Sequence, residues 1–218
     1  MKILTVPSPL LRQKSKPVKK IDGSVCRLIK EMTAFLLQND YAVGLSAPQT
    51  GNFLRLFALK NPRKKKVRTL RRTSEPLYQR SETPACRQAG RTRKPQIAIH
   101  SHLDNAGLSD TGVTVFINPE IVFSSKKTLL DIKPKEKFLL EGCLSVPGVY
   151  AFINRPEEIR IKYLDESGKP RFLTAPRSLV VYLQHEYDHL DGILFIDRAV
   201  AQKEKLYRME KDGSLGEI

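Results

Sequence analysis

The sequence has few cysteines, no tryptophan and no long apolar run. Its three cysteines, Cys26, Cys86 and Cys143, lie far apart and form no Cys-x-x-Cys pair, so no disulfide framework is expected. No stretch approaches the roughly 20 apolar residues that cross a bilayer, and no basic leader precedes an apolar run. These absences predict a soluble protein of a reducing, bacterial-type cytoplasm, without a membrane partner.

Acidic residues are also scarce, because 23 Asp and Glu stand against 38 Lys and Arg, which gives a formal charge of +15. About half of the excess lies in residues 62–111, which hold 12 basic and 4 acidic residues and show no sustained hydrophobic period. We interpret this segment as a basic, disordered insertion in a single catalytic domain that covers residues 1–218. It could be a solvated loop, an RNA-contacting arm or an insert without function, and basic charge specifies no nucleic-acid sequence.

Two segments carry the spacing of amphipathic helices, residues 24–38 and residues 176–190. The candidate capping and terminating residues are Asp22 or Ser24 for the first helix, and Thr174, Pro176 and Gly192 for the second. The first segment predicts an amphipathic helix that packs against the core. The second predicted helix contains the candidate metal-binding residues.

Short segments that are dense in apolar, β-forming residues predict strands. They are residues 53–59, 113–117, 149–153 and 159–164, and a short strand near Phe172 after a turn at 166–170. Strands of this kind between two helices indicate an α+β domain.

The sequence HEYDH lies within the second predicted helix and suggests a metal site. His185 and His189 are four residues apart, so their imidazoles project from one face and can reach a single cation. Glu186 can approach a water molecule bound to that cation without itself being a ligand of the cation. Chance produces HExxH in a chain of this length with odds on the order of one in a hundred. Two exposed histidines on a solvated helix are the alternative.

A third ligand is needed, since a catalytic site of this type generally has three protein ligands and one open position. The extended motif HExxHxxGxxH would place a histidine six residues after His189, but Phe195 occupies that position. The other histidines, His100 and His102, lie in the basic segment and are poor candidates. Cys143 is the best candidate, because a thiolate binds divalent transition metals well, although a lone cysteine in an apolar run is often a small core residue.

Three motifs follow one another along the chain: Gly44–Gln49 is GLSAPQ, Glu141–Ser145 is EGCLS and His185–His189 is HEYDH. They resemble the GLAAPQ, EGCLS and HExDH motifs of the peptide deformylase family, and the opening Ile3–Arg12 is also of that family's type. The resemblance covers residues 1–61 and about 112–205. It departs from the family at Ala42, where many relatives have glycine, at Ser46, which replaces an alanine, and in the basic segment.

The resemblance implies an α+β fold with mixed or antiparallel sheets around a central HExxH helix, and with N-terminal and C-terminal helices. It implies hydrolysis of the N-formyl group from the formylmethionine of nascent polypeptides, with release of formate. The metal ligands would be Cys143, His185 and His189, and the metal Fe²⁺, although this ligand set also suits Zn²⁺, Ni²⁺ or Co²⁺. Glu186 would shuttle the proton.

The family also assigns two donors to the developing oxyanion, the Gln49 side-chain amide and the Leu144 backbone N–H. In relatives the segment at Gly44 pairs with the extended substrate, and a residue without a side chain lets the backbone come close. Further pocket candidates are Val43, Leu139, Val181 and Tyr182, all of which could equally be core residues. Arg155 is placed to pair with Glu141 and brace the cysteine loop.

Partners and alternative functions follow from the same residues. Deformylases act on chains that leave the ribosome, so a ribosomal contact is expected, and a C-terminal helix with Lys203, Lys205, Arg208 and Lys211 is the candidate surface. A zinc peptidase built on the HExxH helix is one alternative. A deformylase-like protein without turnover that binds RNA or the ribosome is another.

Overall fold

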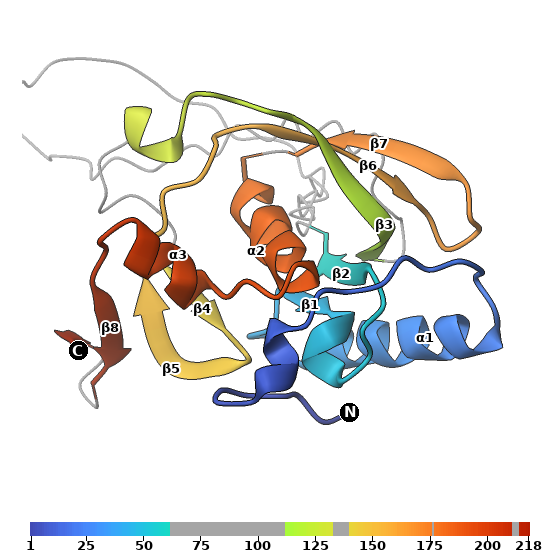
Figure 1. The fold of residues 1–218 in the computed structure, drawn as a ribbon, viewed down its shortest axis with the longest axis horizontal. Helices are drawn as coiled ribbons and strands as arrows, with labels where there is room; N and C mark the ends of the chain where they lie inside the picture. The colour runs from blue at the N-terminus through green and yellow to red at the C-terminus, as the bar shows by residue number, and fades with distance from the viewer. Residues whose placement is uncertain (62–111, 133–139, 176, 211–213) are drawn as a thin grey trace, which may run out of the picture. The chain divides into compact units, whose positions relative to one another are not determined.

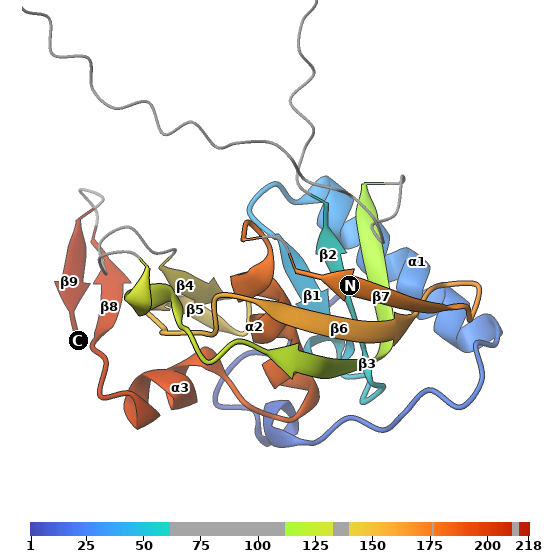
Figure 2. The same cartoon turned by 90° about the horizontal axis from the view of Figure 1, so that it is seen from above.

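The structure, a computed structural model, describes residues 1–61, 112–132, 140–175, 177–210 and 214–218. The predicted insertion at 62–111 lies outside these residues, as do Leu139 and Lys211. Within the described residues, two antiparallel sheets lie on either side of helix α2 (Val180–Leu190), as Figures 1 and 2 show. The structure thus has the expected α+β organisation around the HExxH helix. None of the helices described is long and apolar enough to span a bilayer.

The larger sheet has five antiparallel strands in the order β1-β2-β3-β6-β7. Its strands are β1 (Gly44–Ser46), β2 (Leu56–Lys60), β3 (Val113–Ser124), β6 (Ile159–Leu164) and β7 (Pro170–Thr174). Four of them correspond to predicted strands, with β3 continuing well beyond the predicted end to pair with β6. The turn between β6 and β7 is held by Asp165, which accepts hydrogen bonds from the backbone N–H groups of Ser167 and Lys169.

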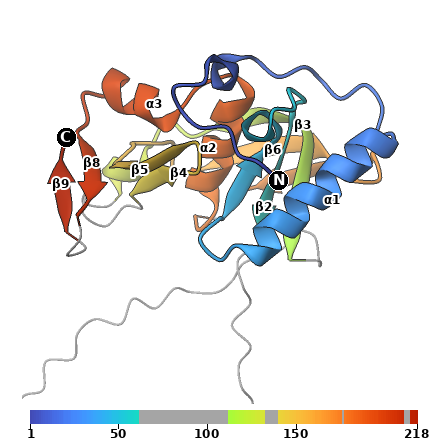
Figure 3. The same cartoon turned by 90° about the horizontal axis from the view of Figure 1, so that it is seen from below.

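Strand β2 is buried on both faces, which explains its unbroken apolar sequence. Leu56 and Ala58 pack into the core with helix α1 (Gly23–Gln38), whereas Phe57 and Leu59 pack into the core with α2. The two helices therefore cover opposite faces of the sheet, and Figure 3 shows α1 lying along one of them. The predicted N-cap of α1 is confirmed, because Asp22 accepts hydrogen bonds from the first turn of the helix.

Helix α2 begins four residues later than predicted. Thr174 does not cap it, because this residue is the last of β7 and pairs with Arg160 of β6. The sheet continues one step further, since the Ala175 N–H donates to the carbonyl of Ile159 at 2.9 Å. Thr174 and Ala175, which the sequence places at the start of the helix, thus extend the sheet instead. Pro176 lies outside the described residues. At the other end Gly192 follows the helix in the left-handed region, as expected.

The smaller sheet has the strand order β4-β5-β8-β9. Its strands are β4 (Glu141–Cys143), β5 (Val146–Ala151), β8 (Leu206–Met209) and β9 (Leu215–Glu217). The expected helix through Lys203, Lys205 and Arg208 is wrong, because the last helix, α3 (Phe195–Ala201), ends before them and β8 pairs with β5. The Tyr207 ring lies edge-on to Phe152 at 5.8 Å, a contact that favours the strand.

Candidate metal centre

Three side chains from distant parts of the sequence converge beside α2. One ligating atom of each of Cys143, His185 and His189 lies within 4.8 Å of those of the other two. The Cys143 Sγ is 3.2 Å from the His189 Nε2. Strand β4 ends at the cysteine, and α2 places the two histidines one turn apart on the same face. The residues singled out by the sequence thus meet at one point, and Cys143 forms no disulfide.

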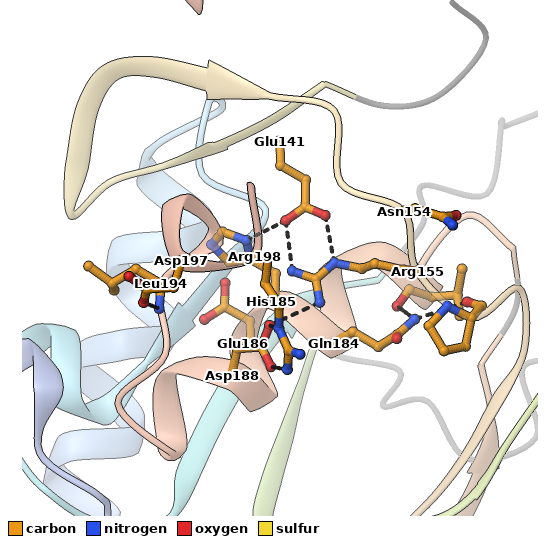
Figure 4. A network of polar contacts seen from close by, with 12 residues as sticks. Glu141, Asn154, Arg155, Gln184, His185, Glu186, Asp188, Leu194, Asp197 and Arg198 are labelled. Atoms are coloured by element: carbon orange, nitrogen blue, oxygen red, sulfur yellow. Dashed lines mark hydrogen bonds and ion pairs between the residues drawn. The ribbon is translucent and has the colours of Figure 1, made fainter. Parts of the chain in front are cut away.

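A buried carboxylate orients the first histidine. The Glu141 Oε2 is 2.9 Å from the His185 Nδ1, which leaves the other ring nitrogen for a cation. Glu141 is itself clamped by Arg155, whose guanidinium donates to both carboxylate oxygens at 2.6 and 2.9 Å. The predicted Arg155–Glu141 contact is therefore confirmed. Figure 4 shows this chain of contacts leading to the imidazole.

The same network extends to α3. Asp188, on α2, accepts a hydrogen bond from Arg155 at 3.0 Å and two from Arg198 at 2.6 and 3.1 Å. Sequence reasoning missed both Asp188 and Arg198. An aspartate within an otherwise buried helix stretch was the available signal, because a carboxylate is seldom buried without a cationic partner.

The cluster attracts one positive charge. Burial disfavours protonation of His185, but the Cys143 sulfur and the Glu141 carboxylate outweigh it and raise its pKa to about 10. Burial and then the charge of His185 hold the pKa of His189 well below its usual value. Two imidazoles and a thiol that favour one shared positive charge are a suitable donor set for a divalent cation. Among the described residues, the buried His189 Nδ1 has no hydrogen-bond partner.

Glu186 is buried next to the cluster. Its carboxylate accepts a hydrogen bond from the Ser46 hydroxyl, and burial raises its pKa. Gly44 makes room for this carboxylate, because a Cβ there would clash with the Glu186 Oε1 and lie 2.6 Å from the Leu59 side chain. The structure thus adds a reason for glycine that the sequence did not provide. Ser46, which replaces the alanine of the family motif, also has a structural role, because its hydroxyl is the hydrogen-bond partner of the Glu186 carboxylate.

Gln49 directs its amide toward the cysteine loop. Its Nε2 is 3.2 Å from the Ser145 Oγ and 3.5 Å from the Cys143 Sγ. Its Oε1 accepts from the Ser46 N–H at 2.8 Å, which fixes the amide orientation. The side chain is almost fully buried, with 1% exposed, so its donor group is preorganised rather than solvated.

A cavity of about 430 Å³ opens beside these groups. Its lining includes Val43, Gly44, Val181 and Tyr182 of the predicted pocket, together with Gln49, Cys143, Leu144, His185 and Glu186. The predicted pocket residue Leu139 lies outside the described residues. The lining residues that sequence reasoning missed include Tyr41, Leu140, Val149 and Tyr150. Nothing in their local sequence distinguishes them from ordinary surface or strand residues.

The comparisons with known proteins point to one family. The model of the family described as polypeptide deformylase matches residues 1–205. The peptide deformylase of Mesorhizobium japonicum is 31% identical, with 99% of this chain and 96% of the relative covered. That of a Picosynechococcus species is 35% identical, covering 87% of this chain and 73% of the relative.

Solved structures agree with these relatives. The peptide deformylase of Ehrlichia chaffeensis superposes with a TM-score of 0.66 at 27% identity, covering 93% of this chain and 89% of that one. The Synechococcus elongatus enzyme, solved in complex with actinonin, gives a TM-score of 0.61 at 27% identity and covers 91% of this chain and 78% of its own. Motifs, site geometry, sequence relatives and fold agree, and the chain belongs to the polypeptide deformylase family.

Proposed function

We propose that this peptide deformylase removes the formyl group from formylmethionyl nascent peptides by using Cys143, His185 and His189 as the ligands of one divalent metal. The observation that carries the proposal is the convergence of these three ligating atoms within 4.8 Å at the wall of a cavity that Glu186 also lines. We further propose that residues 1–218 form a single catalytic domain, interrupted by the basic segment at 62–111. The family model spans that segment, which supports one domain rather than two.

Glu186 carries the proton in this mechanism. A divalent cation held by Cys143, His185 and His189 would supply Lewis acidity and lower the pKa of a nearby water. The Glu186 carboxylate takes the proton of the attacking water and delivers it to the departing amine, while the bond between the formyl carbon and the methionine nitrogen breaks to release formate. Burial raises the pKa of Glu186 toward the working pH, which suits a group that must both accept and donate. The Ser46 hydroxyl holds the carboxylate in place.

The oxygen of the formyl group becomes negative during attack and needs donors already in position. We assign this role to the Gln49 amide and to the backbone N–H of Leu144. Gln49 is suited to it because its Oε1 is held by the Ser46 N–H, so its Nε2 is directed toward the cysteine loop. Loss of one such donor costs about 3 kcal/mol of barrier, so Gln49→Ala should lower kcat by at least about 100-fold.

The methionine side chain would enter the apolar part of the cavity. Val43, Val181 and Tyr182 line the cavity. Gly44 lies at the same wall, in β1, an outer strand of the larger sheet whose backbone can pair with an extended peptide.

Fe²⁺ is the metal we propose for the working enzyme, with Zn²⁺, Ni²⁺ or Co²⁺ as substitutes. A thiolate and two imidazoles form a borderline-soft set that accepts all of these ions. An oxidisable thiolate beside a ferrous ion would make the enzyme sensitive to oxygen. We also propose a cytoplasmic location and a ribosomal contact, for which Lys203 and Arg208 remain candidates as exposed cations.

Formate release from formyl-Met-Ala-Ser, measured for the natural chain and for Glu186→Gln, tests the mechanism. The variant keeps the size of the side chain but cannot accept the proton, so its kcat should fall by at least about 100-fold with the metal content unchanged. Equal rates from the two proteins would contradict the mechanism. Cleavage of an internal peptide bond would instead favour the zinc peptidase, and ribosome binding without formate release would favour the binding protein.

A further inference from the structure

The first six residues of the chain contact both segments that carry the proposed oxyanion donors. The Leu4 N–H donates to the carbonyl of Gln49 at 2.7 Å, and the Val6 N–H donates to the carbonyl of Ser145 at 2.9 Å. Gln49 is one of the proposed donors, and Ser145 directly follows the other, Leu144. Two N–H groups two residues apart thus bridge two loops that are 96 positions apart in sequence.

The side chains of this N-terminal strap, residues 3–6, also join two parts of the core. Ile3 packs against the cluster between α1 and the larger sheet. Leu4 and Val6 pack against the cluster that α3 forms with the smaller sheet, whereas Thr5 is exposed. Figure 3 shows the segment running from the region of β1 and α1 toward α3. The strap therefore lies across the junction where the cysteine loop meets the Gly44–Gln49 segment.

The two bridged loops also touch each other directly. The Gln49 Nε2 lies 3.2 Å from the Ser145 Oγ, so three hydrogen bonds and the backbone from Leu4 to Val6 form a closed ring. In such a ring, the two strap bonds fix the backbone of Gln49 relative to that of the cysteine loop. The position of the Gln49 amide relative to the Leu144 N–H depends on that backbone spacing.

We propose that the strap is a positioning element for the oxyanion site, acting through the Leu4 and Val6 N–H groups. Its two backbone hydrogen bonds reach the carbonyls of Gln49 and Ser145, so it acts through the residues that carry or adjoin the donors. This inference rests on the proposed function, because it requires Gln49 to stabilise the transition state. A misplacement on the order of 1 Å at such a donor can cost about 100-fold in rate, so a loosened strap should lower kcat strongly and KM little.

Leu4→Pro tests the proposal because it removes the N–H. Leu4→Ala keeps the N–H and loses the packing, and Lys2→Pro introduces the same ring at an exposed residue outside the strap. We expect kcat to fall by about 10- to 100-fold in Leu4→Pro, by far less in Leu4→Ala, and not at all in Lys2→Pro. Metal content and the visible spectrum of the Co²⁺ form should be unchanged in all three. Should Leu4→Pro fail to fold, a chain without residues 1–5 replaces it.

A double-mutant cycle with Gln49→Ala separates positioning from general stability. If Leu4 acts through Gln49, adding Leu4→Pro to Gln49→Ala should cost no more than about 2- to 3-fold in kcat. Equal costs of Leu4→Pro in both backgrounds, or a lowered melting temperature with unchanged kcat, would overturn the proposal. Wild-type activity in Gln49→Ala would instead refute the assigned role of Gln49, so the two failures are distinguishable.

Discussion

Removing the Arg155 guanidinium should destabilise the protein and loosen the metal site together. The side chain is 4% exposed and is shared by the Glu141 and Asp188 carboxylates, which are also buried. Arg155→Met keeps most of the volume but leaves Glu141 without its bidentate partner. Loss of one member of a buried ion pair costs about 3–5 kcal/mol, because an uncompensated charge remains in the core. Asp188 retains Arg198, so its share of the loss is smaller.

The effect should reach the metal through His185. Glu141 orients this imidazole, and loss of such a partner costs about 10- to 100-fold in metal affinity. Arg155→Lys should recover little of either property, because an ammonium cannot form the paired donors that bind both oxygens of Glu141.

Urea unfolding of metal-stripped protein, together with a competition assay for Co²⁺, measures both effects. Arg171→Met is the matched control, since Arg171 pairs with Asp165 at 2.8 Å while its side chain is 51% exposed. An exposed pair of this kind contributes about 0–1 kcal/mol. The reasoning is refuted if Arg155→Met unfolds within about 1 kcal/mol of the wild type, or if it binds Co²⁺ with unchanged affinity.

Three further outcomes follow from the structure. Gly44→Ala should lower kcat by up to about 100-fold, because the new Cβ displaces the Glu186 carboxylate, and steady-state kinetics with circular dichroism will separate this from unfolding. Chelation should abolish activity and lower the melting temperature, since a metal at 100 times its Kd contributes about 2.7 kcal/mol, and adding metal back should restore both. Burial acts to raise the pKa of Asp165, but its bonds from Ser167 and Arg171 lower it below its ordinary 3.8, so this carboxylate stabilises the fold above that value. The stability gap between wild type and Asp165→Asn should therefore close in urea unfolding as the pH falls from about 5 toward about 1.

The sequence predicts most reliably those features that depend on a few neighbouring residues. The HExxH spacing places two imidazoles on one helix face whatever the rest of the fold, and the N-cap of α1 depends only on Asp22 and the first turn. Strand β2 was also recognisable, since its two buried faces require an unbroken apolar run.

Pairing between distant segments decided the cases where prediction failed. Thr174 and Pro176 form a good helix start in isolation, but pairing with Arg160 keeps Thr174 in β7. The sequence predicts a basic C-terminal helix, but Leu206 in that segment pairs with Ala151 of β5. Whether a segment forms a strand depends mainly on the residues that it pairs with across the sheet, and a single sequence does not show which residues these are.

Helix α2 also explains why the site is assembled from so many segments. Its residues His185, Glu186, Asp188 and His189 are all at least nine-tenths buried, and a buried polar group needs a partner. Glu141 supplies one for His185, Ser46 for Glu186, and Arg155 and Arg198 for Asp188. Cys143 lies against the His189 Nε2, while the His189 Nδ1 has no partner among the described residues.

The charges in this arrangement do not all cancel within the protein. The carboxylates of Glu141 and Asp188 are matched by the guanidiniums of Arg155 and Arg198. In the proposed metal-bound state the Cys143 sulfur would be a thiolate and both imidazoles neutral donors, so that Cys143 and Glu186 would leave two negative charges unmatched. A divalent cation held by Cys143, His185 and His189 would balance these two charges, so metal binding and burial of the Glu186 carboxylate would depend on the same electrostatic condition.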